Sequence, residues 1–342
     1  MIKKYRFVPM KKLVLYVFLA TLFIYGCETD FEVNAPYKEF MVIDGLLNAN
    51  DSVQSIRISK AFLGVGNALV MAQQTDSINY GDVLDVQLQR FFFNSVSQTI
   101  LLTRSENNDK DTGVFARNYV LYKTNQKILQ DGSEYKLIVT NRQTGVVATS
   151  RTKIVDSLIA GNIPGGDSID FVAGGNAPFI IRFTPGQNAF YYEMIIRFNY
   201  REINPSTGLS TAHKVDWYFA SPTALTSSEV IFSFYKNNLF ATLGANIPDK
   251  PGFTRRIDSL ATGLRPFEVI MLEGSEDLNT YIELQKPATG VVQERPLFTT
   301  IENGLGLFTS RYIKTVPRFP KQATIAAFDT SSALMNKNFQ FN

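Results

Sequence analysis

The sequence predicts a mostly β protein made of two antiparallel β-sandwich domains of the immunoglobulin-like type, with one or two short helices in the second domain. Short segments rich in Val, Ile, Phe, Tyr and Thr recur along the chain, and these residues favour strands. Several segments alternate apolar and polar residues with a period of two, as half-buried strands do. Clusters of Gly, Asn, Asp and Ser separate the segments at spacings typical of an antiparallel sandwich.

The first domain is expected at residues 38–155. Its clearest strand is 84–91, in which Leu84, Val86 and Leu88 alternate with polar residues and would face a core. Turn residues separate this segment from the others. Strands are predicted at residues 40–47, 52–59, 84–91, 97–103, 115–122, 134–140 and 146–153.

Residues 156–175 are rich in Gly, Asp and Ser and are predicted to form a linker. The second domain is expected at 176–328, and a polar tail follows at 329–342. A short helix is predicted from 237 to 243, and another after Ser275, which has the form of an N-cap. Strands are predicted at residues 179–184, 190–200, 214–219, 229–235, 267–274 and 310–316.

The N-terminal residues have the pattern of an export signal. Residues 1–26 carry five Lys and Arg residues, and the apolar run at 13–25 is too short to span a membrane. Ile24, Gly26 and Cys27 resemble the box cut by the lipoprotein signal peptidase. This resemblance implies cleavage between Gly26 and Cys27 and acylation of Cys27. An ordinary secretory signal that contains the single cysteine is the alternative.

Residues 27–38 are predicted to be a lipidated acidic tether. Acidic residues close behind an acylated cysteine also resemble the surface-export signal of Bacteroidota-type lipoproteins, with a plain solvated spacer as the alternative. With Cys27 acylated, no cysteine remains for disulfides, thiolate catalysis or zinc sites.

The charge of the mature chain argues against a nucleic-acid partner. The whole chain has 34 Lys and Arg and 31 Asp and Glu, and five of the basic residues but none of the acids lie in residues 1–26. The mature chain therefore carries 29 basic and 31 acidic residues, a net charge of −2. Binding to phosphate backbones needs a concentrated basic stripe, which this chain lacks.

Four short features occur together in this sequence: the acylated Cys27 with its tether, the strand at 41–47, the segment from 132–137 to 154–157, and the segment at 302–308. Together they resemble the Bacteroidota outer-membrane lipoprotein family called "domain of unknown function 4249". The resemblance covers most of the mature chain. It implies β-sandwich domains, an outer-membrane location and frequent association with TonB-dependent receptors, and it supplies no catalytic residues.

No metal site or cofactor is expected. His213 is the one histidine of the chain and lies in a polar connection without a Gly-x-Ser-x-Gly turn, which favours a surface role over a catalytic triad. Residues 107–113 have oxygen donors at alternate positions, as calcium loops do. Their glycine is one position late and Asn118 replaces the expected glutamate, so a solvated turn is the favoured interpretation.

Carboxylate pairs for glycoside hydrolysis stay open, because such pairs are defined by separation in space. The candidate acids on or near predicted strands are Glu193, Asp216, Glu268 and Glu273. Their positions are equally explained if each simply faces solvent.

Two aromatic residues are candidates for ligand binding. Trp217 and Tyr191, each next to another aromatic residue, could stack on sugar rings or fill a pocket of a partner. Because neighbouring strand residues face opposite sides, burial in a core is the favoured alternative for at least one residue of each pair.

The tripeptide Asp-Ser-aliphatic recurs five times and resembles the O-glycosylation acceptor motif of Bacteroidota-type exported proteins. Asp-Ser pairs that form turns before strands are the alternative. The five candidate serines are Ser52, Ser77, Ser157, Ser168 and Ser259.

These observations predict a non-enzymatic lipoprotein of the outer membrane, anchored through Cys27 and facing the cell exterior. The expected role is that of an accessory subunit of an outer-membrane β-barrel complex, with a TonB-dependent receptor as the expected type of partner. A surface lipoprotein that delivers a glycan or a peptide to a transporter is the alternative, and a hydrolase is the third hypothesis.

Overall fold

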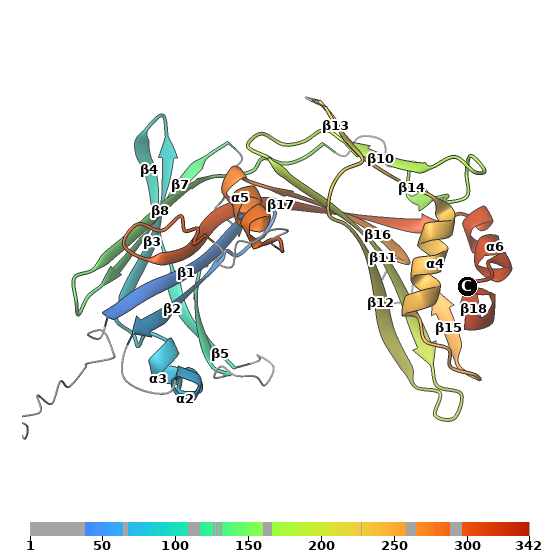
Figure 1. Cartoon of the computed structure of the whole chain (residues 1–342), viewed down its shortest axis with the longest axis horizontal. Coiled ribbons are helices and arrows are strands. Elements are labelled where there is room, and N and C mark those ends of the chain that lie inside the picture. The colour runs from blue at the N-terminus through green and yellow to red at the C-terminus, as the bar shows by residue number, and fades with distance from the viewer. Residues whose placement is uncertain are drawn as a thin grey trace, which may run out of the picture. The chain divides into compact units, whose positions relative to one another are not determined.

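Two hydrophobic cores, each covered by sheets, organise the structure, which is a computed structural model of the whole chain (Figure 1). The structure describes residues 38–63, 68–108, 117–125, 127, 129, 132–159, 166–226, 228–257, 265–287 and 296–341. Within these ranges, Glu39–Ala61 and the residues from Ala68 onwards belong to one compact unit. Lys38, Phe62 and Leu63 are the described residues of a second unit.

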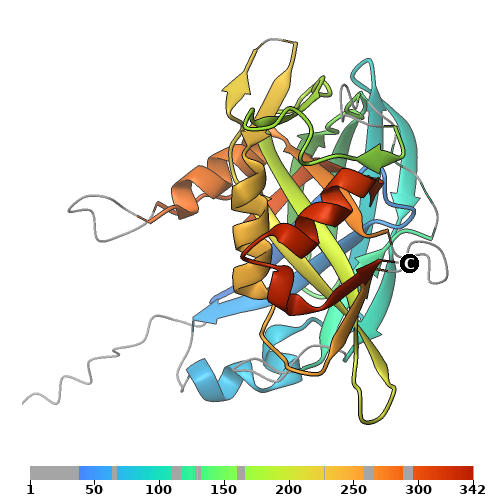
Figure 2. The same ribbon diagram turned by 90° about the vertical axis from the view of Figure 1, so that its right-hand side faces the viewer.

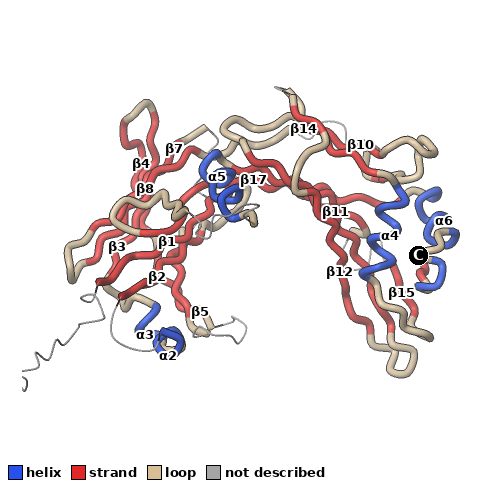
Figure 3. The backbone as a smooth tube through the Cα atoms, viewed as in Figure 1, coloured by secondary structure: helices blue, strands red, loops and turns tan. Residues whose placement is uncertain are grey.

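About half of the described residues lie in strands and far fewer lie in helices, so the mostly β fold class is confirmed (Figure 3). Strands β1 to β8 span Lys38–Asn48, Ser55–Leu63, Leu84–Phe92, Ser95–Leu101, Thr103–Asn107, Tyr119–Lys123, Glu134–Asn141 and Val147–Lys153. Strands β9 to β18 span Ser168–Ile169, Phe179–Phe183, Tyr191–Ile203, Ser210–Phe219, Ala224–Leu225, Val230–Phe234, Thr254–Ile257, Phe267–Gly274, Leu305–Pro320 and Phe339–Phe341.

The helices are short. Helices α2 to α6 span Ala68–Ala72, Thr75–Ile78, Lys236–Asn246, Glu276–Gln285 and Gln322–Thr330, and a 3-10 helix covers Met335–Lys337. The predicted N-cap of α5 is confirmed, since the Ser275 hydroxyl accepts a hydrogen bond from the Leu278 amide. None of the helices in the described ranges is long and apolar enough to cross a membrane.

The described strands form three sheets. The large sheet has eleven strands, nine of them in the order β18-β15-β11-β16-β17-β1-β2-β6-β5, with β12 paired to β11 and β9 to β17. A second sheet has the order β4-β3-β7-β8, and a third has the order β10-β14-β13. Strand β1 pairs with β17 in parallel, from Val42 opposite Leu305 to Asn48 opposite Arg311. This pair joins the first described strand to the long strand that precedes α6.

The first core lies between two sheets and is a β-sandwich. The large sheet contributes Ile43 and Ile56, while the β4-β3-β7-β8 sheet contributes Val86 and Leu137. These strands alternate buried and exposed positions, as the sequence pattern of 84–91 predicts. The core also includes Ile301 and Phe308 from the C-terminal part of the chain.

The second core is rich in phenylalanine and lies between the large sheet, the β10-β14-β13 sheet and helices α4 and α6 (Figure 2). The Phe267 ring has its centroid 5.0 Å from those of both Phe171 and Phe198, and the Phe328 ring lies 5.4 Å from Phe198. Burial of such large rings supplies the hydrophobic stabilisation that this chain needs, because it has no disulfides.

Two predicted irregular segments are parts of this second core. Residues 156–175, interpreted above as a linker, supply buried Ile169 and Phe171, and β9 pairs with β17. Residues 329–342, interpreted as a polar tail, include buried Leu334 and strand β18, which pairs with β15. The tail prediction is wrong for these residues, because isolated apolar side chains in a polar sequence were enough to pack against the core.

The parallel β1–β17 pair depends on a close approach of two backbones. Gly306 has a φ of +108°, and a Cβ atom built on it would lie 2.2 Å from the Ile43 carbonyl oxygen. On the β1 side, a Cβ on Gly45 would lie 2.8 Å from the Phe308 ring. Both glycines are therefore required for the pairing.

We expect Gly306→Ala to lower the free energy of unfolding by more than about 2 kcal/mol, because the new Cβ combines a left-handed backbone with a steric clash. Urea denaturation of the purified protein measures this change. Gly81→Ala is the matched control, since a Cβ on Gly81 would meet nothing within 4 Å. Equal stabilities of the two variants would contradict the proposed packing.

Candidate functional site

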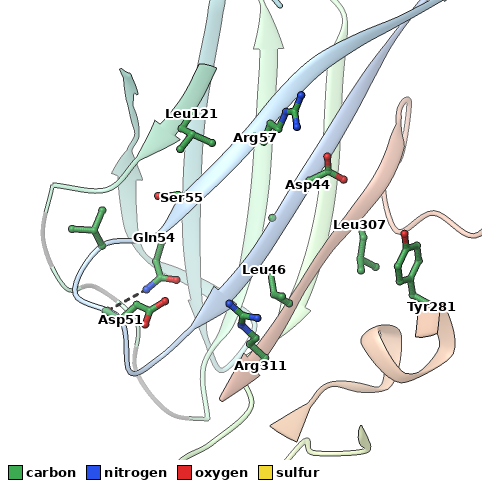
Figure 4. A pocket seen from close by; sticks show the side chains of 12 residues that line it. Asp44, Leu46, Asp51, Gln54, Ser55, Arg57, Leu121, Tyr281, Leu307 and Arg311 are labelled. Carbon is green, nitrogen blue, oxygen red and sulfur yellow. Dashed lines mark hydrogen bonds between the residues drawn. The ribbon is translucent and has the colours of Figure 1, made fainter. Parts of the chain in front are cut away.

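A cavity of about 440 Å³ opens on the outer face of the large sheet, and we call it the β1–β17 cavity. Figure 4 shows its wall of strands β1, β2 and β17, with Tyr281 of helix α5 on one side. Asp44 of β1 stands directly opposite Leu307 of β17, and both belong to the sheet face that points away from the first core. The lining residues are Asp44, Gly45, Leu46, Asp51, Val53, Gln54, Ser55, Arg57, Leu121, Tyr281, Leu307 and Arg311.

Two arginines of this cavity are not satisfied by the protein. Arg57 comes from β2 and Arg311 from β17, and both side chains are half-buried. The Nε atom of each is buried and has no hydrogen-bond partner among the described residues. A guanidinium group has five N–H donors, and leaving a buried donor unpaired costs about 1–3 kcal/mol. Such groups are suited to bind oxygen acceptors of a ligand.

An acid and a phenol complete the polar lining. Partial burial raises the pKa of the Asp44 carboxyl, and the positive charge of Arg57 counteracts part of that rise. The Tyr281 ring is 37% exposed at the other side of the cavity. The site therefore offers donors on the arginines, acceptors on Asp44 and one aromatic ring.

The turn beside the cavity is held rigidly by a buried glutamine. The Gln54 amide nitrogen donates to the carbonyls of Asn48 at 2.9 Å and Asp51 at 3.2 Å, and its oxygen accepts from the Asn48 amide at 2.9 Å. The Gln54 backbone amide donates to the Thr124 hydroxyl at 2.9 Å. These bonds fix the wall of the cavity before any ligand arrives.

A second cavity, of about 580 Å³, lies beside α3, β5 and β6. Arg104 pairs with Glu106 and donates to the Tyr80 carbonyl at 3.2 Å, while Asn79 donates to the Asn118 carbonyl at 3.0 Å. The side-chain oxygen of Asn79 has no partner in the described part of the chain. Residues 109–113 of the calcium-like segment predicted at 107–113 lie outside the described residues. No metal-ligand cluster of His, Cys, Asp or Glu occurs among the described ones.

The two candidate aromatics lie on strands β11 and β12 of the large sheet, and neither lines the β1–β17 cavity. The Trp217 ring packs against the second core, with its centroid 4.4 Å from Phe219 and 5.1 Å from Phe234. Tyr191 is half-buried, and its hydroxyl donates to Glu193 at 2.9 Å. Burial and this bond raise the pKa of Tyr191.

The remaining predicted site residues are spread over the surface. Ser52 and Ser157 are exposed, whereas Ser77 and Ser168 are half-buried on α3 and β9. Cys27, Gly26 and Ser259 lie outside the described residues. The glycosylation and lipidation predictions stay predictions.

Three of the four candidate carboxylates are engaged in local pairs on the outer sheet face. Asp216 accepts two hydrogen bonds from Arg197, at 2.7 and 2.9 Å, and these hold the pKa of Asp216 below its ordinary value. Glu268 lies 3.7 Å from the same arginine. Glu193 accepts the bond from Tyr191. These pairs give each acid a structural partner.

Glu273 is different, because it is fully buried on the inner face of β16. Its carboxylate accepts from the Gly186 amide at 3.1 and 3.3 Å. Burial raises the pKa of Glu273 to about 7, and the hydrogen bond from Gly186 opposes part of the rise. Glu273 does not line either cavity described above, so the geometry assigns it no substrate.

His213 belongs to a network around a second buried acid. Glu202 accepts from Lys250 at 2.5 Å and from buried Arg255 at 3.0 Å, and the His213 ring nitrogen lies 4.0 Å away. Burial raises the pKa of Glu202, but the two cations outweigh it and hold the value below the ordinary one. Arg255 also donates to the Lys337 carbonyl at 2.6 Å. The network fastens the C-terminal residues to β15.

An apolar hairpin is the most exposed hydrophobic feature of the described chain. Phe92 and Phe93 form the tip between β3 and β4 and are 64% and 88% exposed, with ring centroids 4.4 Å apart. Phe93 and Asn94 have φ values of 44° and 61°, as in a type I′ turn. A phenylalanine in this conformation is strained, and such outliers suggest a functional demand.

Strand β4 itself is an unprotected edge. It pairs with β3, and no described strand pairs with its other side. Residues 91–103 contain no charged side chain, and Val96 and Leu101 are 50% and 74% exposed. Natural edge strands are usually protected by charges, proline or a covering segment, so an edge of this kind marks an interaction surface. The opposite edge, β8, is covered where Thr149 bridges to Glu302.

Sequence reasoning missed both features. The uncharged run at 91–103 was visible in the sequence as three consecutive phenylalanines before a short turn. By contrast, no spacing could have joined Arg57 to Arg311, because the parallel β1–β17 pair alone brings them to one cavity.

The arrangement defines a mostly β protein with a polar cavity and an apolar edge, and the comparisons add no family to this description. No protein-family model matches the chain, and no curated protein matches it. Among solved structures, the chain is similar to CBD12 from CALX1.2, at 10% identity over 80% of this chain and 100% of that one, with a TM-score of 0.16. The calcium-binding domain CBD12 of CALX1.1 gives the same identity and TM-score over 79% and 98%. A TM-score this low carries no argument.

We expect stability to depend on pH through Glu273. An ordinary glutamate has a pKa of 4.5, and that of Glu273 is raised to about 7 in the fold. Between these values the folded chain keeps a proton that the unfolded chain has lost, so the free energy of unfolding falls as the pH rises through this window. The difference is roughly 3 kcal/mol and is complete above pH 7.

Glu273→Gln removes the charge and retains an acceptor for the Gly186 amide. Thermal melts from pH 4 to pH 8 should show that the variant gains stability over the wild type as the pH rises, with no gain at pH 4. Glu268→Gln, on the opposite face of the same strand, is the control and should show no such gain. A constant difference between Glu273→Gln and wild type across this range would contradict the assignment.

Proposed function

We propose that the protein is an exported lipoprotein, anchored in the outer membrane through Cys27 and facing the cell exterior, that acts as a non-enzymatic subunit of a β-barrel complex. The export signal, the box at 24–27 and the acidic tether at 27–38 support the anchoring and the location. The several acyl chains of a mature bacterial lipoprotein anchor stably, whereas a single chain does not.

The observation that carries the subunit role is the uncharged edge of β4 with Phe92 and Phe93 at its tip. Exposed aromatic side chains are the residue type that most often supplies binding energy at protein interfaces. A free strand edge adds main-chain hydrogen bonds when a partner contributes a strand. The stretch 91–103 lacks the lysines and arginines that a membrane-surface segment uses, which favours a protein partner over lipid.

An outer-membrane β-barrel fits this surface. The loops and turns of such barrels continue their strands beyond the membrane and can offer both strand edges and apolar pockets. The resemblance described above points to a TonB-dependent receptor as the type of barrel. Delivery of a glycan or a peptide to such a transporter is the second candidate function, and the β1–β17 cavity favours it.

A pull-down of the lipidated, C-terminally tagged protein in mild detergent tests the subunit role, with mass spectrometry to identify what is bound. We expect a stoichiometric outer-membrane barrel with wild type and at least a tenfold lower yield with the double variant Phe92→Ser, Phe93→Asn. Asparagine tolerates positive φ, so this variant should unfold at or above the wild-type temperature.

Leu209→Ser is the matched control, because Leu209 is 71% exposed but lies in the β11–β12 connection. It should capture the barrel as wild type does. The proposal fails if wild type captures no barrel under conditions that preserve known complexes, or if the double variant captures as much as wild type.

We expect Cys27→Ser to abolish acylation and to release the protein from the membrane fraction. Metabolic labelling with a palmitate analogue and cell fractionation measure the two effects. Incorporation of the label into Cys27→Ser, or membrane retention of the unlabelled variant, would contradict the lipoprotein assignment. A conservative change in the tether, Thr29→Ser, controls for the substitution itself and should keep both properties.

A further inference from the structure

We propose that the β1–β17 cavity is a binding site for a short acidic carbohydrate, whose carboxylate pairs with Arg57 or Arg311 and whose hydroxyl groups donate to Asp44. The site is independent of the β4 edge, because its residues belong to the outer face of the large sheet and the hairpin belongs to the β4-β3-β7-β8 sheet. Binding can therefore be measured on the purified protein without any partner.

The two arginines carry the argument for an anion. Each has a buried Nε without a partner and forms no ion pair within 4 Å among the described residues. The buried Nε of Arg255 also lacks a partner, but Arg255, like Arg197, holds an acid within 3.0 Å. Two guanidinium groups without a paired acid therefore line the same cavity, and an anionic ligand would supply the charge that each lacks. A planar carboxylate matches the guanidinium fork, with two parallel hydrogen bonds.

The acid in the cavity argues for hydroxyl groups on the same ligand. Asp44 has no hydrogen-bond or ion-pair partner within 4 Å among the described residues, and its carboxylate oxygens can only accept while ionised. A second carboxylate beside it would be repelled, whereas the hydroxyls of a sugar ring donate to it. Figure 4 shows Arg57 and Asp44 projecting from neighbouring strands, with Arg311 beyond Leu46 on the same sheet face.

Size and shape agree with a small sugar. A cavity of about 440 Å³ lies within the range of typical small-ligand sites. Tyr281 presents an aromatic ring at the side of the cavity, and its hydroxyl makes no hydrogen bond within the described ranges. The ring can cover the apolar face of a sugar while the hydroxyl bonds to it. Gln54 holds the facing turn in place, so the site is preorganised.

Isothermal titration of the lipidated full chain in mild detergent tests the proposal, with trigalacturonate as the probe. Galactotriose has the hydroxyls without the carboxylates, and tri-alanine has a carboxylate without the hydroxyls. We expect binding of trigalacturonate that is at least tenfold tighter than that of either analogue. Comparable binding of tri-alanine would overturn the sugar assignment, and comparable binding of galactotriose would overturn the role of the arginines.

At least one of the variants Arg57→Gln and Arg311→Gln, and the double variant, should weaken trigalacturonate binding by about tenfold or more, the usual worth of a charge-assisted hydrogen bond. Because these arginines have unpaired buried nitrogens, both variants should unfold at or above the wild-type temperature. Arg182→Gln is the control. Arg182 lies on β10 and pairs with Glu229 at 3.7 Å, so this variant should bind as wild type does. No binding of trigalacturonate at millimolar concentration, or unchanged binding by the double variant Arg57→Gln, Arg311→Gln, would overturn the proposal.

Discussion

The parallel pairing of β1 with β17 is the constraint on which the rest of the structure depends. It requires two backbones to approach where Gly45 and Gly306 lie, and it aligns the start of the described chain with its last long strand. Through this pair, Ile301 and Phe308 enter the first core. The same strand continues to Pro320 and pairs with β16 in the second half. Both cores therefore share one structural element, and Tyr312 packs against each of them.

Much of this fold was predictable, because alternation is a local signal. The strands near 84–91, 134–140 and 267–274 agree with β3, β7 and β16 to within a few residues, and Ser275 caps α5 as its sequence indicates. Helix α6 and strand β18 were missed. Both elements are short, so that packing against the second core, rather than local pattern, decides their structure.

The candidate sites divide in the same way. The box at Cys27 is a contiguous motif, so it can be recognised from the sequence alone. The arginines of the β1–β17 cavity come from strands that meet only after folding. Trp217 agrees with the alternative that the sequence favoured, which was burial in a core. An isolated tryptophan attracts attention as a ligand-binding residue, yet an inward position on β12 places its ring among Phe219 and Phe234. Chemistry visible in a sequence is thus a poor guide to function until the faces of the strands are known.

The β1–β17 pair also bears on how such a chain reaches its location. Contacts between residues about 260 positions apart make for slow folding, because the closure entropy of a long loop must be spent before the pairing stabilises anything. In the export that we propose, the N-terminal half would emerge first, and its sandwich could not close until residues 305–311 arrived. Premature folding is the main obstacle to transport through a narrow channel. A topology in which a late strand completes the first one would delay folding until such a translocation was nearly over.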